Sequence, residues 1–138
     1  IKSFSMTGQR RDLNREKFKS EKLSALFNNT ESNANKNLNH LRSAMDVRAK
    51  LPQFHPQSKM ECLSSGRADI VVLKRGMGTD AVFAIHNMTD NKINYRLSEK
   101  HLSTKIKNDF KMTDYLTFNE YNFNNLELEP FQVIWLGF

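Results

Sequence analysis

The stretch that decides the fold is "ADIVVLKRGMGTDAVFAIHNM", residues 68–88. It contains two runs rich in β-branched and aromatic residues, one before and one after the Gly-rich segment GMGTD. Apolar runs of this length around a Gly- and Asp-containing loop are typical of β-hairpins. We therefore predict two antiparallel strands here.

The same short period continues on both sides of this hairpin. Five further segments are predicted strands: "MECLSS" (60–65), "INYRLSE" (93–99), "DYLTF" (114–118), "NLELE" (125–129) and "FQVIWLGF" (131–138). The segments SSG, GMGTD and TDN are predicted hairpin loops between the first four strands. The pattern indicates a small antiparallel β-sandwich. Its predicted core residues are Val72, Phe83, Ile85, Tyr95, Val133 and Trp135.

The first part of the chain has a helical period instead. Ser20 is a predicted cap for a short helix "EKLSALF". A second helix is predicted over about residues 33–51, ended by Pro52. Its apolar stripe, which we expect to be buried, consists of Ala34, Leu38, Leu41 and Met45.

Composition excludes some classes of protein and leaves others open. The chain has 138 residues, enough for one domain or for one domain with an attached piece. No apolar run approaches the roughly 18 residues needed to cross a bilayer. The net charge of +6 is spread along the sequence, so we predict neither a nucleic-acid nor a membrane partner. The single cysteine, Cys62, is predicted to be a buried structural thiol.

The predicted strands carry no recognisable catalytic motif. His86 lies in an apolar strand and is predicted to be a core or edge residue. The other histidines are His40, His55 and His101, and they show no metal-ligand spacing. We therefore predict no metal and no organic cofactor.

A basic cluster near the start is more suggestive. "TGQRRDLNREKF", residues 7–18, places Arg10, Arg11 and Arg15 around Asp12 and Asn14. Guanidinium groups this close together repel one another unless a negative or polar group lies between them. That group is either the chain's own Asp12 or a phosphate, a sugar or a nucleic acid.

Four stretches together resemble the sucrose phosphorylase branch of glycoside hydrolase family 13, the α-amylase superfamily. They are "TGQRRDLNREKF", "LRSAMDVRAKLPQFHPQ", "AVFAIHNMTDNKINYRL" and "DYLTFNEYNFNNLELEPFQVIWLGF". Residues 11–15 match the family pattern R-D-[IL]-N-R. The pattern R-x-x-x-P-x-F-H-P is matched by Arg48, Pro52, Phe54, His55 and Pro56. The resemblance spans nearly the whole chain.

The resemblance implies a fold and a domain division. The fold is mainly β: a C-terminal antiparallel β-sandwich preceded by the last loop and helix of a truncated (β/α)8 barrel. Residues 1–56 would be the barrel part and residues 57–138 the sandwich. In this family the nucleophilic Asp, the acid/base Glu and the stabilising Asp lie on earlier barrel strands. We therefore expect a C-terminal fragment that contains no catalytic residue, an expectation that its opening "IKSFSM" also favours.

The implied parent activity is a retaining α-glucoside phosphorylase that yields α-glucose 1-phosphate. Arg11 matches the family position that faces the acceptor, so we predict that it binds phosphate or substrate. Asp12, Asn14 and Arg15 are predicted to support the loop, and no role is assigned to Arg10. The alternative for all three arginines is that they only brace the loop through Asp12 and backbone carbonyls.

Other functions stay open. One alternative is a hydrolase or transglucosidase of the same superfamily. Another is a free-standing β-sandwich module that binds carbohydrate or nucleic acid through exposed aromatic side chains. Tyr115, Tyr121 and Phe123 are candidates for such stacking, although we expect them to pack or to line a strand edge. The expected partners are a sugar and inorganic phosphate as co-substrate, reached through the missing barrel, and the expected location is cytoplasmic.

Overall fold

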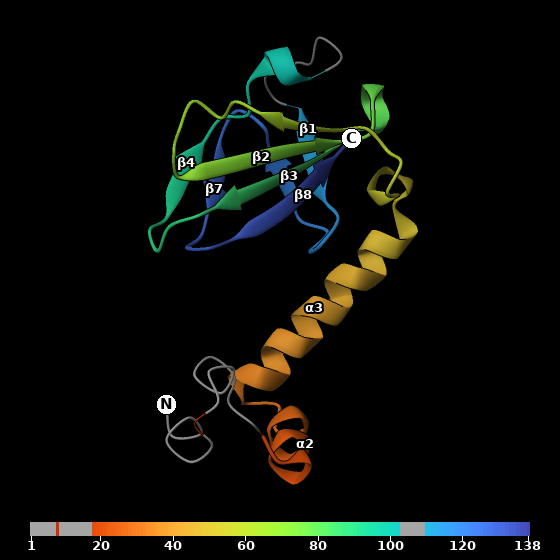
Figure 1. Cartoon of the computed structure of the whole chain (residues 1–138). Coiled ribbons are helices and arrows are strands. Elements are labelled where there is room, and N and C mark those ends of the chain that lie inside the picture. Colours follow the sequence, from red (N-terminus) through yellow and green to blue (C-terminus); the bar gives the residue numbers. More distant parts are fainter. Residues whose placement is uncertain (1–7, 9–17, 103–109) are drawn as a thin grey trace. The chain divides into compact units, whose positions relative to one another are not determined.

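A computed structural model of the chain describes Gly8, residues 18–102 and residues 110–138 (Figure 1). The chain divides into two compact units, Ile1–Arg42 and Ser43–Phe138. The described residues form two α-helices and eight β-strands, and the strands form two sheets.

The two helices begin and end close to the predicted bounds. Helix α2 spans Ser20–Asn28 and helix α3 spans Asn33–Lys50. The predicted cap for α2 is wrong by one residue, because Lys19 occupies the N-cap position and makes no side-chain capping bond. In α3 the cap comes from Ser32, whose hydroxyl accepts the backbone N–H of Asn35 at 3.0 Å.

The expectation of a buried face on α3 is wrong for the described residues. No residue of the helix is buried, and the side chains of Leu41 and Met45 are 61% and 51% exposed. Ala34 and Leu38, from the same stripe, are half-buried. The apolar stripe that the sequence predicts therefore exists, but its last two members are not covered.

The larger sheet has six strands in the order β1-β2-β3-β8-β5-β6. The smaller sheet pairs β4 with β7. Every pairing is antiparallel, as the sequence predicts. The strand bounds are Met60–Leu63 (β1), Ile70–Arg75 (β2), Val82–Asn87 (β3), Ile93–Tyr95 (β4), Lys111–Asp114 (β5), Glu120–Asn122 (β6), Leu126–Leu128 (β7) and Val133–Gly137 (β8).

One predicted strand is wrong and two real strands were not predicted. The segment 114–118 turns tightly after the last residue of β5, and neither β5 nor β6 was predicted, apart from Asp114 itself. The reason lies in the side chain of Asp114. Its carboxylate accepts the backbone N–H of Leu116 and the hydroxyl of Thr117, which turns the chain where an extended strand was expected.

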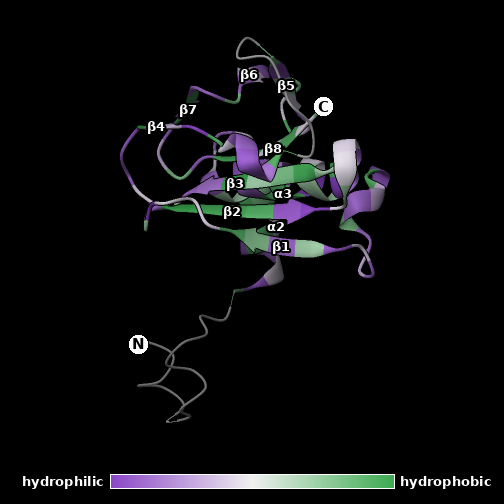
Figure 2. Cartoon of the chain, turned by 90° about the horizontal axis from the view of Figure 1, so that it is seen from above, coloured by the Kyte–Doolittle hydropathy of each residue, from purple (hydrophilic) through white to green (hydrophobic). Residues whose placement is uncertain are grey.

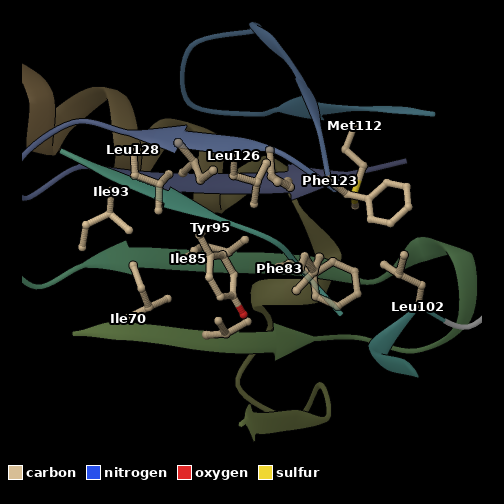
Figure 3. Close-up of a cluster of buried hydrophobic side chains, with 14 of the residues drawn as sticks. Ile70, Phe83, Ile85, Ile93, Tyr95, Leu102, Met112, Phe123, Leu126 and Leu128 are labelled. Carbon is tan, nitrogen blue, oxygen red and sulfur yellow. The ribbon is translucent and has the colours of Figure 1, made fainter. Parts of the chain in front are cut away.

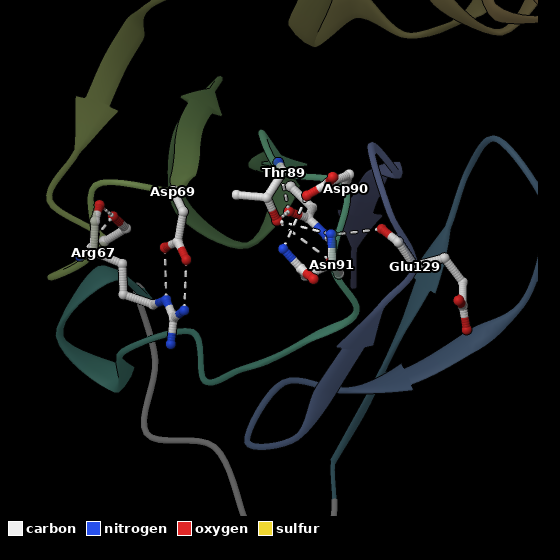
Figure 4. A network of polar contacts seen from close by, with 8 residues as sticks. Arg67, Asp69, Thr89, Asp90, Asn91 and Glu129 are labelled. Atoms are coloured by element: carbon white, nitrogen blue, oxygen red, sulfur yellow. Dashed lines mark hydrogen bonds and ion pairs between the residues drawn. The ribbon is translucent and has the colours of Figure 1, made fainter.

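The predicted third hairpin is also wrong. Strand β4 does not pair with β3 but with β7, so the TDN segment carries the chain from one sheet to the other. Asn87, which is 2% exposed, fixes this crossing by donating hydrogen bonds to the carbonyls of Asn91 and Glu129 at 2.7 and 2.9 Å. Figure 4 shows the surrounding network, including Thr89.

A single apolar core lies between the two sheets (Figure 3). Ile93, Tyr95, Leu126 and Leu128 of the smaller sheet belong to the same buried cluster as residues of β2, β3 and β8. Burying each large apolar side chain contributes about 1.5–3 kcal/mol. Figure 2 shows β2 and β3 coloured as hydrophobic over much of their length, as expected for strands that supply this core.

The core prediction is confirmed on four strand positions and wrong on two. The confirmed residues are Val72, Phe83, Ile85 and Tyr95. On β8 the predicted phase is wrong by one residue, because Ile134 pairs with Ile85 and Leu136 pairs with Phe83 on the inner face.

Since strand side chains alternate between faces, Val133 and Trp135 lie on the outer face of the larger sheet. Val133 is 36% exposed, and Trp135 is half-buried. The outer face is therefore where these two apolar side chains must find their contacts.

Candidate functional site

The predicted phosphate-binding residue lies outside the described residues. This holds for Arg11 and also for its predicted supports Asp12, Asn14 and Arg15, and for Arg10. Their roles stay predictions. The described part of the chain, however, includes the second motif that carried the family resemblance, R-x-x-x-P-x-F-H-P.

This second motif forms a pocket. The pocket has a volume of about 330 Å³ and lies where α3 passes into the following loop. Its lining residues are Met45, Arg48, Ala49, Leu51, Pro52, Phe54 and His55. Four of these residues belong to the motif. A pattern read as a family signature thus corresponds to one concave surface within residues 45–55.

Proline chemistry explains the shape of the pocket. Pro52 cannot continue a helix, and the residue before a proline is pushed toward extended backbone. Leu51 accordingly has φ −99° and ψ 107°, and Pro52 opens a short 3-10 turn, η2 (Pro52–Phe54). The carbonyl of Pro52 accepts the N–H of His55 at 3.0 Å and the hydroxyl of Ser58 at 2.9 Å. The chain therefore folds back tightly at the end of α3.

Arg75 of β2 holds this turn against the larger sheet. Its Nε donates to the carbonyl of Gln53 at 3.0 Å and its Nη2 to the carbonyl of His55 at 2.8 Å. Gln53 in turn donates through Nε2 to the carbonyl of Asp80 at 2.8 Å. Two loops and one strand thereby fix the backbone beneath the pocket.

Aromatic packing completes the floor of the pocket. The rings of Phe54 and Trp135 lie 4.4 Å apart between centroids, tilted by 35°, and the guanidinium of Arg75 lies 5.9 Å from the Phe54 ring centroid. This contact accounts for the position of Trp135 on the outer face. The sequence does not predict this contact, because the apolar run of β8 does not show on which face Trp135 lies; the one available signal was a Phe between two prolines.

Two cationic or donor groups line the otherwise apolar pocket. The guanidinium group of Arg48 makes no hydrogen bond or ion pair with any residue that the structure describes, although its backbone carbonyl accepts the N–H of Leu51 at 3.3 Å. His55 accepts the backbone N–H of Gln57 at Nδ1, at 3.3 Å, so in the neutral imidazole its Nε2 carries the proton and is a donor. The pocket therefore presents hydrogen-bond donors beside an apolar wall.

Cys62 is exposed, so the prediction of a buried thiol is wrong. The residue lies on β1, which forms one edge of the larger sheet. Its cross-strand partner is Leu73, and both side chains point to the outer face. An edge strand with one open face leaves the thiol accessible.

The histidines lie on separate elements: His40 on α3, His55 directly after η2, His86 on β3 and His101 at the end of a short 3-10 turn. His101 lies with Nε2 3.2 Å from the carbonyl oxygen of Ser64. Within residues 18–102 and 110–138, no three His, Cys, Asp or Glu side chains are close enough to hold a metal ion. His86 is half-buried on β3 between Val71 and Val133 of the neighbouring strands.

His86 makes stability depend on pH. Burial lowers the pKa of His86 below its ordinary value of 6.5, because desolvation disfavours the imidazolium. The unfolded chain then takes up a proton first, so stability is full above about pH 6.5 and falls as the pH drops toward the lower folded pKa. We expect the urea midpoint of the native chain to fall more between about pH 8 and pH 5 than that of His86→Gln. Identical pH profiles for the two proteins would contradict this role.

Two of the aromatic residues proposed for stacking, Tyr121 and Phe123, are packed against the core. Phe123 is fully buried, and Tyr121 packs against the core while its hydroxyl accepts a bond from Gln132 Nε2 at 3.2 Å. Two other phenylalanines, missed by the sequence reasoning, are exposed instead. Phe118 and Phe131 are 75% and 66% exposed, and both have positive φ angles, 61° and 54°.

Comparison with known proteins does not assign this arrangement to a family. No family model and no curated protein matches the chain. None of the described helices combines the length and the apolar character needed to cross a membrane. A functional interpretation therefore depends on the motifs, the pocket and the exposed surfaces.

Proposed function

We propose that the chain is the C-terminal part of a retaining α-glucoside phosphorylase of the sucrose phosphorylase branch. The parent enzyme would transfer glucose from sucrose or a related glucoside to phosphate. In this proposal the chain supplies the last barrel loop, with Arg11, and the last barrel helix, α3. The rest of the chain forms an appended β-rich domain.

The observation that supports the proposal most strongly is the partly exposed apolar stripe of α3. α3 is an 18-residue helix with an apolar stripe, no residue of it is buried, and Leu41 and Met45 are more than half exposed. An amphipathic helix normally buries its apolar stripe against a neighbouring element. A barrel helix obtains that cover from the adjacent helices and the barrel strands. The motif residues Arg48, Pro52, Phe54 and His55 follow at the end of this helix, in the order that the family pattern requires.

The proposed chemistry is a double displacement with retention. One carboxylate of the parent attacks the anomeric carbon while a second protonates the leaving oxygen, at a separation of roughly 5–5.5 Å. The covalent glucosyl intermediate then reacts with phosphate, which takes the glucosyl group and leaves as α-glucose 1-phosphate. Both carboxylates would lie on barrel strands outside this chain.

Arg11 has a defined task in that scheme. Phosphate can replace water as the acceptor only if it is held next to a carboxylate that repels it. A guanidinium group offers a rigid pair of donors matched to phosphate oxygens and supplies the compensating charge. Asp12 would orient this group, and Asn14 and Arg15 would fix the loop. No metal or organic cofactor is required, and a cytoplasmic location would retain the phosphorylated product.

The direct test of this assignment is the coding sequence upstream of Ile1. The proposal predicts an alternating pattern of strands and helices there, with one Asp nucleophile, one Glu acid/base and a second Asp. A coding sequence with no such barrel pattern upstream would overturn it. Upstream strands without those three acids would favour a different superfamily activity.

A second candidate function is a carbohydrate- or nucleic-acid-binding module. The exposed side chains of Phe118 and Phe131 favour this candidate. A bulky residue with a positive φ angle is strained, and a phenyl ring left in water provides no hydrophobic stabilisation to offset that strain. Stacking on a sugar or a base would use both rings. Binding of α-glucan or single-stranded nucleic acid that is lost in Phe118→Ala and Phe131→Ala, but unchanged in Phe110→Ala, would support this candidate over the enzyme.

A further inference from the structure

We propose that the pocket at the end of α3 is a docking site for a polypeptide segment that carries a carboxylate beside a bulky apolar side chain. The site is built entirely from residues 45–55, within one compact unit. The inference concerns the surface that Met45 exposes in this chain and not what the parent catalyses; a parent barrel that covered Met45 would occupy the same surface, so the two proposals compete for this residue.

The apolar half of the site is an exposed wall of side chains. Met45, 51% exposed, stands with Ala49, Leu51 and Phe54 around a space of about 330 Å³. This volume is at the small end of the range for ligand pockets, so it suits one leucine or phenylalanine side chain and not a larger body. Filling it would remove Met45 and the edge of Phe54 from water, which favours binding in proportion to the apolar area covered.

The polar half of the site is suited to binding a carboxylate. The Arg48 guanidinium has no partner among the described residues, and the His55 Nε2 position is a donor. An arginine beside an apolar surface binds a planar carboxylate through two parallel hydrogen bonds. Asp46 does not neutralise Arg48, since residues two apart on a helix point in directions about 200° apart. The site is therefore complementary in charge to an acidic segment.

The site is also rigid before anything binds. Arg75 fixes the carbonyls of Gln53 and His55, and Trp135 packs on the back of the Phe54 ring. A preorganised floor loses little conformational freedom on binding, so more of the contact energy appears as affinity. The hydrogen bond of Ser58 to the carbonyl of Pro52 holds the far side of the turn in the same way.

A polypeptide fits these features better than a small inorganic anion. Free phosphate could bind to Arg48 but would leave the apolar side chains of Met45 and Phe54 exposed to water. A neutral apolar segment could cover that wall but would leave Arg48 without a counter-charge. An apolar side chain followed or preceded by Glu or Asp satisfies both halves together, as buried anchors with a charged rim do in protein interfaces.

The test uses the whole chain and the peptide acetyl-Glu-Leu-Phe-Glu-amide, titrated by calorimetry and by shifts of backbone amide NMR signals. We expect signals from residues 45–55 to shift, and the acetyl-Gln-Leu-Phe-Gln-amide peptide to bind about tenfold more weakly. Arg48→Gln should weaken binding of the acidic peptide by about tenfold, because charge-assisted hydrogen bonds are lost. Met45→Ser should weaken binding of both peptides.

The matched control is Arg96→Gln, which removes the same charge from an exposed residue paired with Glu99 after β4. It should leave the affinity unchanged. Equal weakening by Arg48→Gln and Arg96→Gln would mean non-specific attraction to a basic protein and would overturn the proposal. It would also be overturned by equal binding of the two peptides or by inorganic phosphate displacing the acidic peptide. Amide shifts confined to residues other than 45–55 and their contacts Arg75 and Trp135 would overturn it as well. Because both variants change exposed side chains, unchanged thermal unfolding should accompany either result.

Discussion

Replacing Asp114 with alanine is expected to destabilise the chain by about 3–5 kcal/mol, the largest effect of any single polar substitution in the described residues. Asp114 is fully buried at the end of β5. Its carboxylate accepts the N–H groups of Trp135 and Leu116, at 2.8 and 3.1 Å, and the hydroxyl of Thr117 at 2.6 Å. Alanine would leave the N–H groups of Trp135 and Leu116 without this acceptor, whereas water can reach the exposed Thr117, and each buried unsatisfied donor costs about 1–3 kcal/mol.

The substitution should also loosen the joint between β5 and β8. Here the backbone N–H of Trp135 donates to the side chain of Asp114 and not to a backbone carbonyl. The carbonyl of Trp135 still accepts the backbone N–H of Tyr115, at 2.9 Å. Urea unfolding measures the loss. Asp114→Asn keeps one acceptor oxygen for Trp135 and should lose clearly less than alanine. The control is Asp80→Ala, at an exposed residue, which should stay within about 0.5 kcal/mol of the native chain. A loss below about 1 kcal/mol in Asp114→Ala would show that Asp114 does not anchor the joint.

Under the phosphorylase proposal, Arg11→Ala is expected to have the largest effect on the activity of the proposed full-length enzyme. We expect kcat/KM for phosphate to fall about ten- to a hundredfold, the range for losing charge-assisted hydrogen bonds to a dianion. Cleavage of the donor glucoside with water as acceptor should change much less, because the proposal places the carboxylates that form the glucosyl intermediate on barrel strands outside this chain. The measurement is the ratio of glucose 1-phosphate to free glucose released by the variant.

Arg15→Ala provides the comparison for Arg11. We assign Arg15 to the support of the loop, so its loss should lower the reaction with phosphate and with water by similar factors. Arg11→Lys should restore part of the phosphate reaction, since it keeps the charge but not the two-pronged geometry. If Arg11→Ala lowered both reactions equally, Arg11 would be a bracing residue and the phosphate role would be wrong.

The strand pattern of the fold was predictable where one face is uniformly apolar. β2 and β3 were found because each is an apolar run rich in β-branched and aromatic residues beside a glycine-containing loop. Burial alternates at the start of β2, whereas in β3 Val82 and Ala84 are buried together with Phe83 and Ile85. β8 was found, but its phase was not, because "VIWL" is apolar on both faces and alternation cannot choose between them. Only the pairing of β8 with β3 and the contact of Trp135 with Phe54 decide which face is inside.

Features that depend on single polar side chains were not predictable. The turn after β5 requires the buried carboxylate of Asp114, and the crossing after β3 requires the buried amide of Asn87. The sequence analysis placed both residues in predicted strands, Asp114 at the start of 114–118 and Asn87 near the end of the segment that closes at Met88, so neither turn was expected. Their long-range acceptors and donors, such as the carbonyl of Glu129 and the N–H of Trp135, belong to strands far along the chain.

The candidate pocket was predictable in its residues but not in its form. The pattern containing Arg48, Pro52, Phe54 and His55 was singled out from the sequence by its resemblance to a family pattern. Nothing in that pattern indicates that Arg75 would hold the backbone below it, because that contact spans about 20 residues and two elements. The chemistry of a site can thus be visible in a sequence while the contacts that shape it are not.

The most direct test of the phosphorylase proposal is the product released by the full-length protein from sucrose, and from related α-glucosides, in the presence of inorganic phosphate. The proposal predicts α-glucose 1-phosphate as the main product, with retained configuration at the anomeric carbon, and little free glucose. Free glucose as the main product at saturating phosphate would contradict the proposal and identify a hydrolase. Absence of any cleavage of these glucosides by the full-length protein would contradict the assignment to this superfamily.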